Sequence, residues 1–297
     1  MIIGIVVNLT KENVYTILED FISKLQANEF QVLLFDELQT DLNISKMKLK
    51  KSSFVKENLF FKKSDVVISI GGDGTMLATS IKAHAYNKPV LGLNLGKLGF
   101  LAEININQID SLIDELKKGV HQIEDRMIIE GSCIGHNMEK LYAINDIVID
   151  KAGWPKMIEI TIEVDDEYVT KFSADGLIIA TPTGSTGYSI SADGPIVNPK
   201  ANVITLSPIC PHSLSIRPIV LNGDQKIKIT ADSLHKEIQV NCDGQRVFAF
   251  KPPLSLIINK SDNPLKLVHT SLTSYFKTLR KKLLWGIDLR NLPTENN

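Results

Sequence analysis

A glycine-rich segment with one carboxylate, Gly71-Gly72-Asp73-Gly74-Thr75, has the residue types and spacing of a phosphate site. Glycines let the backbone turn tightly and approach a phosphate, and the amides of a following helix N-terminus attract negative charge. An aspartate there repels phosphate unless it has a task, either accepting a proton from an attacking hydroxyl or helping to hold Mg²⁺. A helix cap or an ordinary Asp-Gly turn explains the same residues without chemistry. The local sequence supports both interpretations equally.

A second candidate is the hydroxyl-rich run of residues 181–191, which directly follows an apolar strand pattern. Hydroxyl groups and the backbone amides of such a segment suit the hydroxyls of a ribose and the edges of a base. The alternative is a Ser/Thr-rich surface loop. The length of the run and its position right after a strand favour the binding role.

The elements that must position the glycine segment alternate between strand and helix patterns over the first hundred residues. Continuous apolar runs at residues 2–7, 31–35, 65–70 and 89–93 predict buried strands, and residues 13–27 and 76–84 have helical spacing. This order predicts a mostly parallel sheet covered by helices, in which ligands bind at the carboxyl ends of the strands. The lysine-rich residues 45–63 are interpreted as a solvated loop.

The pattern changes from about residue 125. Residues 157–164 alternate between apolar and polar side chains, and short strand patterns separated by Gly, Pro, Asn and Asp continue to residue 268. Such spacing predicts an all-β, sandwich-like domain. Two domains are therefore expected, an α/β domain at residues 1–103 and a β-rich domain at 104–270, and the helical spacing of residues 274–285 predicts a further surface helix.

Composition excludes several classes of protein. The 297 residues are 43% hydrophobic and 23% charged with a net charge of −1, which argues against a general nucleic-acid binder. The three cysteines, Cys133, Cys210 and Cys242, show neither disulfide nor zinc spacing. No apolar run approaches the roughly 20 residues that span a bilayer, and the apolar N-terminus lacks a basic region, so we expect a cytoplasmic protein without membrane association.

Several segments, taken together and in order, resemble the NAD kinase family over nearly the whole chain. The first motif alone is weak evidence, because diacylglycerol-type lipid kinases and phosphofructokinases are similar there. The run at 181–191 is highly specific. The segments that carry the resemblance are residues 71–75, 94–101, 145–146, 174–176, 181–196, 211–215 and 217–218.

The resemblance implies a reaction in which the γ-phosphate of ATP passes to the 2′-hydroxyl of the adenosine ribose of NAD. It makes Asp73 the general base and Mg²⁺, carried mainly by the phosphates, the metal. It also implies that the chain end, about 271–297, returns to complete the first domain. Family members are usually homo-oligomers, so a dimer or tetramer is expected.

Site residues follow from the matching positions. The phosphate loop is formed by Gly71, Gly72, Gly74 and Thr75. The implied NAD contacts are Asp73, Gly74, Phe100, Asn145, Asp146, Lys156, Asp175, Thr186, Gly187, Tyr188, Ser189, Ile190, Ser191 and Gln245. Three positions depart from the family pattern: Asp146 stands where Glu is usual, Gly187 where Ala is common, and Ser173 where many relatives carry Arg.

Two alternatives use the same motif differently. A lipid kinase of the diacylglycerol type would share the glycine segment but would not need the hydroxyl-rich run, and it would want a membrane-facing apolar or basic surface. A non-catalytic NAD-binding module would keep the second candidate site, but Asp73 would then have no task.

Overall fold

The computed structural model describes residues 1–50, 53–96 and 99–286. The chain divides into two compact units, Met1–Glu124 together with the segment from Lys266 onward, and Asp125–Leu265. The first unit thus extends to Glu124 rather than to residue 103, because the intervening residues add strands and a helix to its sheet. Lys97 and Leu98 of the 94–101 motif, and residues 287–297 of the expected returning end, lie outside the described residues.

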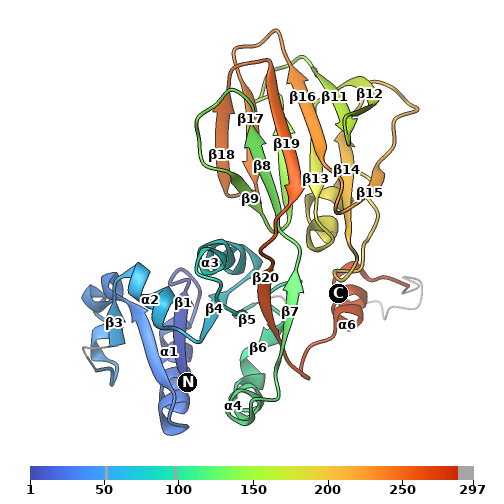
Figure 1. The fold of residues 1–297 in the computed structure, drawn as a ribbon. Helices are drawn as coiled ribbons and strands as arrows, with labels where there is room; N and C mark the ends of the chain where they lie inside the picture. Colours follow the sequence, from blue (N-terminus) through green and yellow to red (C-terminus); the bar gives the residue numbers. More distant parts are fainter. Residues whose placement is uncertain (51–52, 97–98, 287–297) are drawn as a thin grey trace, which may run out of the picture. The chain divides into compact units, whose positions relative to one another are not determined.

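The first unit is built on an eight-stranded sheet in the order β3-β2-β1-β4-β5-β20-β7, with β6 beside β5 (Figure 1). The pairs from β3 to β20, and that of β5 with β6, are parallel, which confirms the α/β prediction. The strands are β1 (Ile2–Val7), β2 (Gln31–Phe35), β3 (Phe54–Val55), β4 (Val66–Gly71), β5 (Val90–Asn94), β6 (Ile104–Asn105), β7 (Gln122–Arg126) and β20 (Leu265–His269).

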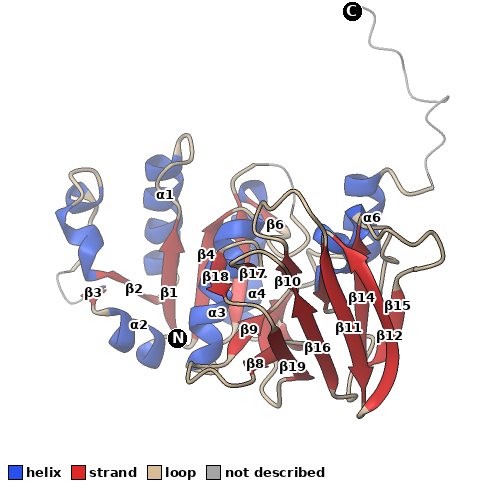
Figure 2. Ribbon diagram, turned by 90° about the horizontal axis from the view of Figure 1, so that it is seen from above, coloured by secondary structure: helices blue, strands red, loops and turns tan. Residues whose placement is uncertain are grey.

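Helices cover both faces of this sheet, as Figure 2 shows for the two sides of β1. Side chains alternate across a strand, so Ile3 and Ile5 share a core with one set of helices while Gly4 meets Phe60 on the other face. The helices are α1 (Val14–Ala27), α2 (Glu57–Lys63), α3 (Asp73–Ala85), α4 (Ile109–Lys118) and α6 (Tyr275–Leu283), with short 3₁₀ turns η1 (Asp36–Thr40), η2 (Ile44–Lys46) and η4 (Ile106–Gln108).

The solvated-loop interpretation of residues 45–63 was wrong for its second half. The segment contains β3 and α2, and α2 buries Phe60 and Phe61 completely. The sequence did not indicate this helix, because its few apolar residues lie among lysines and do not show a clear helical spacing.

The second unit contains two antiparallel sheets of six strands each, ordered β15-β14-β13-β10-β17-β18 and β12-β11-β16-β19-β8-β9. The strands are β8 (Ile129–Cys133), β9 (Leu141–Ala143), β10 (Asp146–Asp150), β11 (Ile158–Val164), β12 (Glu167–Ala174), β13 (Gly176–Ala180), β14 (Val203–Ile209), β15 (Ile219–Asn222), β16 (Ile227–Asp232), β17 (Ile238–Cys242), β18 (Arg246–Phe250) and β19 (Leu254–Lys260). Two short helical turns, η5 (Thr183–Thr186) and α5 (Tyr188–Ser191), follow β13.

One apolar core joins the two sheets. Ile147 and Ile179 from one sheet share a cluster with Ile160 and Leu256 from the other. The alternation along β11, in which Ile158, Ile160, Ile162 and Val164 are buried between more exposed residues, explains how one face enters this core. The sandwich-like prediction is confirmed.

Candidate functional site

The glycine segment lies where parallel strands of the first unit end. Gly71 closes β4 opposite Asn94, the last residue of β5. Asn8, just past β1, donates from its backbone amide to Ile70 O at 3.0 Å and from Nδ2 to Thr75 Oγ1 at 3.4 Å. The carboxyl ends of three neighbouring strands therefore meet at the N-terminus of α3, as expected for a ligand site in a parallel sheet.

Asp73 is the first residue of α3, but its carboxylate does not cap that helix with a side-chain hydrogen bond. It accepts three backbone amides from the turn after β5: Phe100 N–H at 2.8 Å to Oδ2, and Leu101 and Ala102 N–H at 3.1 and 2.9 Å to Oδ1. A carboxylate has about four lone-pair directions, so among the described residues one on Oδ2 accepts no hydrogen bond, although Lys282 Nζ lies 3.5 Å from this oxygen. The carboxylate is both an anchor for this turn and a remaining acceptor.

Gly99 permits this arrangement. A Cβ atom at this position would overlap the Asp73 carboxylate, far inside van der Waals contact. Gly72 differs, because a Cβ atom there would meet no atom within 4 Å. The open space beside Gly72 fits the predicted phosphate loop, and Gly74 and Thr75 continue from it into the first turn of α3.

In the second unit a pocket of about 290 Å³ gathers several of the predicted residues. Asn145, Asp146 and Tyr188 line it together with Val148, Asp150, Asn241, Asp243 and Gly244. Oδ1 of Asn145 and Oδ1 of Asn241 are buried and accept no hydrogen bond from the described residues. Buried acceptors of this kind need donors, so the pocket suits a ligand that carries amino or hydroxyl groups.

Asp243 holds the turn that presents Asn145 and Asp146. Its carboxylate accepts the backbone amides of Ile144, Asn145 and Asp146 at 2.7–3.3 Å, and Arg246 pairs with it at 3.1 Å. The sequence motifs did not identify Asp243. An Asp-Gly pair in a hairpin turn gives no sign in sequence that it will bind a turn almost a hundred residues away.

Asp146 is buried, with 5% of its surface exposed. Burial, and then the neighbouring carboxylate of Asp243, raise the pKa of Asp146 from 3.8 to about 7, although the Tyr188 N–H favours the charged form. Burial also raises the pKa of Asp150 in the same pocket. The carboxyl group of Asp146 therefore titrates near neutral pH.

The hydroxyl-rich run is two helical turns, η5 and α5, and not an open loop. Several of its hydroxyls serve the fold: Thr181 Oγ1 donates to Ile144 O at 2.6 Å, Ser185 Oγ to Pro182 O at 2.7 Å, and Ser189 Oγ lies 3.0 Å from Ser207 Oγ. Thr186 Oγ1 also faces a backbone carbonyl, that of Thr183, at 3.4 Å. The run therefore works mainly as a rigid support beside the pocket.

The other predicted contacts differ in their surroundings and in their burial. A Cβ atom on Gly187 would lie 3.7 Å from both Asn145 Nδ2 and Asp146 Oδ2, so this glycine borders the same groups. Ile190 is partly buried, while Ser191 and Lys156 are exposed.

Asp175 is engaged with Lys151, whose Nζ lies 2.7 Å from Oδ1. Gln245 lies in the exposed turn between β17 and β18. Neither Lys156, Asp175 nor Gln245 lines the 290 Å³ pocket.

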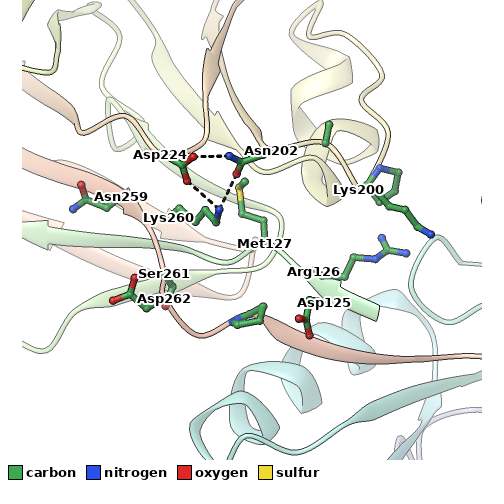
Figure 3. Close-up of a pocket in the computed structure, with 13 residues that line it drawn as sticks. Asp125, Arg126, Met127, Lys200, Asn202, Asp224, Asn259, Lys260, Ser261 and Asp262 are labelled. Carbon is green, nitrogen blue, oxygen red and sulfur yellow. Dashed lines mark hydrogen bonds and ion pairs between the residues drawn. The ribbon is translucent and has the colours of Figure 1, made fainter. Parts of the chain in front are cut away.

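A larger cavity of about 710 Å³ lies elsewhere in the second unit (Figure 3). Its lining mixes acids and bases, and Lys260 is already paired with Asn202 Oδ1 at 2.9 Å and Asp224 Oδ1 at 3.0 Å. It contains none of the predicted residues.

Residues 3–120 match the ATP-NAD kinase N-terminal domain, and residues 144–270 match the ATP-NAD kinase C-terminal domain. A NAD kinase of Prosthecochloris aestuarii is 37% identical over 284 residues, covering 95% of this chain and 96% of that protein. A NAD kinase of Geotalea daltonii is 40% identical over 225 residues, covering 75% of this chain and 79% of that protein.

Among solved structures, an NAD kinase from Archaeoglobus fulgidus in complex with ATP superposes with a TM-score of 0.71 at 27% identity, over 96% of this chain and 99% of the other. Yeast NADH kinase complexed with NADH has a TM-score of 0.88 at 23% identity over 98% and 90% of the two chains, a likeness of fold.

These matches define the class of the protein as an ATP-dependent kinase. The fold agrees with this class, because its parallel sheet ends in a glycine turn with one carboxylate. Within that class the chain belongs to the ATP-NAD kinase family. The relatives named above are all NAD or NADH kinases, so the lipid-kinase and non-catalytic alternatives find no support among them.

Proposed function

We propose that this chain transfers the γ-phosphate of ATP to the 2′-hydroxyl of the adenosine ribose of NAD, giving NADP⁺ and ADP. The observation that carries the proposal is Asp73. Three backbone amides hold its carboxylate in one orientation, and one acceptor direction on Oδ2 stays available. A carboxylate fixed in this way at the end of β4 can receive the proton of an attacking hydroxyl.

In the proposed step, the 2′-O–H bond breaks as Asp73 Oδ2 takes the proton. The 2′-oxygen forms a bond to the γ-phosphorus, and the bond between that phosphorus and the bridging oxygen breaks, leaving its electron pair on ADP. A positioned base contributes about 10²- to 10⁴-fold in rate. The phosphates are proposed to bind at the start of α3, in the loop of Gly71, Gly72, Gly74 and Thr75, where a Cβ atom on Gly72 would meet no atom within 4 Å.

NAD binding is proposed for the pocket of the second unit, and Phe100, a residue of the first unit, is also a proposed contact. Asn145, Asp146 and Tyr188 line this pocket, and the buried Oδ1 atoms of Asn145 and Asn241 accept no hydrogen bond from the described residues. NAD carries donors on its adenine amino group, ribose hydroxyls and carboxamide. The remaining proposed contacts are Asp73, Gly74, Lys156, Asp175, Thr186, Gly187, Ser189, Ile190, Ser191 and Gln245. The buried hydroxyl of Ser189 makes that residue a support more than a direct contact.

Magnesium is proposed to arrive with the ATP phosphates, whose charge it neutralises. Among the described residues, no three His, Cys, Asp or Glu side chains gather into a set that could hold the ion. We also propose a cytoplasmic homo-oligomer, either a dimer or a tetramer, which light scattering of the purified protein would test. In the described part of the chain, no helix is long and apolar enough to cross a membrane.

The test is to incubate the purified chain with ATP, Mg²⁺ and NAD⁺ and to couple NADP⁺ formation to an NADP-specific dehydrogenase. Absence of NADP⁺ contradicts the proposal. Asp73→Asn should lower kcat by about 10²-fold or more. Asp114→Asn, which removes one exposed carboxylate from α4, is the matched control and should keep full activity. If Asp73→Asn keeps more than about a tenth of the activity with a folded circular dichroism spectrum, Asp73 is not the base.

A further inference from the structure

The closing helix of the first unit brings a cation to Asp73. Lys282, near the end of α6, has its Nζ 3.5 Å from Asp73 Oδ2, the same oxygen that keeps an available acceptor direction. The ammonium also lies 4.6 Å from the centroid of the Phe100 ring. Its side chain is 30% exposed and that of Asp73 is 32% exposed, so the pair is open to an incoming ligand.

The contacts of Lys282 hold its ammonium in place and leave N–H groups that can donate to a ligand. A distance of 3.5 Å is longer than the 2.7–2.9 Å of a charge-assisted hydrogen bond, so Asp73 does not fully occupy the ammonium. The face of Phe100 attracts a cation without consuming its N–H groups. Two contacts therefore orient Nζ beside Asp73 while its three donors can still turn to another acceptor.

Charge explains why such a group is needed. A donor phosphate must approach a site where the carboxylate of Asp73 is already present, and like charges at close range repel. Backbone amides at the start of α3 offset part of this repulsion. A lysine beside the carboxylate offsets more of it, and stabilises the charge that spreads over the transferring phosphoryl group.

We propose that Lys282 is a catalytic residue whose ammonium binds the transferring phosphoryl group of ATP beside Asp73. This inference rests on the proposed function. In the step described above, Lys282 neither gains nor loses a proton. It donates hydrogen bonds to the non-bridging oxygens while the 2′-proton goes to Asp73 and the electron pair of the broken bond goes to ADP. The end of the chain thus completes the phosphate site that the glycine segment begins.

The alternative is an anchoring role, in which Lys282 only ties α6 to the turn that contains Phe100. The two roles differ in which constants change. A phosphate contact affects kcat and MgATP affinity and leaves NAD⁺ affinity and stability unchanged. An anchor affects thermal stability, and activity falls only as far as the fold is lost.

The experiment compares Lys282→Gln and Lys282→Arg with Lys281→Gln, an exposed neighbour on α6. For Lys282→Gln we expect kcat to fall about 10²-fold and MgATP to bind about tenfold more weakly in calorimetry, with NAD⁺ affinity and melting temperature unchanged. Lys282→Arg should recover part of kcat because it keeps the charge, and Lys281→Gln should match the wild type.

A kcat for Lys282→Gln within threefold of the wild type overturns the inference, as does a loss of activity that simply follows a fall in melting temperature. Failure of the wild type to form NADP⁺ would instead contradict the proposed function. In that case the MgATP titration still decides on Lys282, because equal affinity of the wild type and Lys282→Gln refutes the contact and a tenfold difference supports it.

Discussion

Replacing Asp146 by Asn should change how the stability of the second unit depends on pH. The folded protein raises the pKa of Asp146 to about 7 from an ordinary 3.8, mainly by burial. A raised pKa means that the folded state holds the proton more tightly than the unfolded chain. The stability that this proton contributes is therefore fully present below pH 4 and is lost as the pH rises through 7.

The size of the effect follows from the two pKa values. At 1.36 kcal/mol per pH unit, the whole difference is worth roughly 4 kcal/mol. At pH 5 the carboxyl of the unfolded chain is already ionised, so somewhat under 2 kcal/mol of this stabilisation is lost there. The loss that remains between pH 5 and pH 8 is about 2.5 kcal/mol. Asn at position 146 does not ionise and keeps an acceptor for the Tyr188 N–H, so Asp146→Asn should be free of this loss.

Urea unfolding at pH 5, 6, 7 and 8 measures the prediction. Trp154 lies in the second unit and Trp285 in the first, so a Trp285→Phe background makes fluorescence report on the second unit alone. The free energy of unfolding of Asp146→Asn should rise relative to the parent by about 2.5 kcal/mol from pH 5 to pH 8. Asp243 is present in both proteins, so most of its own titration cancels.

Asp193→Asn provides the control, because it removes an exposed carboxylate from the same unit. Its stability should follow that of the parent at every pH. A difference between Asp146→Asn and the parent that stays constant within about 0.5 kcal/mol from pH 5 to pH 8 would refute the reasoning, since it would mean that burial does not raise the pKa of Asp146.

Two glycine variants test the first unit. Gly99→Ala should lower the free energy of unfolding by about 1–3 kcal/mol in urea and reduce kcat, because its methyl group would overlap the Asp73 carboxylate; wild-type stability would contradict this packing. Gly72→Ala meets no atom within 4 Å and its φ is −123°, so stability should stay within about 0.5 kcal/mol. The KM for ATP should nevertheless rise if Gly72 receives phosphate, and an unchanged KM would argue against the phosphate loop.

The sequence alone was sufficient for the parts of the protein that depend on local pattern. Buried parallel strands appear as continuous apolar runs, and the strands of the sandwich appear as alternation, so the α/β and β-rich regions could both be predicted. The glycine segment could be placed at a strand end for the same reason. Its chemistry stays open from the sequence alone, because Asp73 in isolation is equally a base, a metal ligand or a helix cap.

Residues 104–124 show why the unit boundary could not be predicted from pattern. Their helix and short strands are compatible with either unit, and only the pairing of β6 with β5 and the place of β7 in the first sheet assign them. Likewise, the sequence pattern does not predict the short helix α2. The tertiary structure identifies it, because Phe60 of α2 packs on Gly4 of β1.

The contacts that matter most for the sites join residues far apart in the chain. Asp243 reaches the turn at Asn145, and Lys282 reaches Asp73 across about two hundred residues. An exposed helix with several lysines has the same sequence pattern whether one of them faces water or a carboxylate. Sequence therefore determined most of the elements that form and the strand end at which the carboxylate of Asp73 lies. The tertiary structure decided what surrounds this carboxylate, because burial, charge and hydrogen-bond partners are set by distance in space.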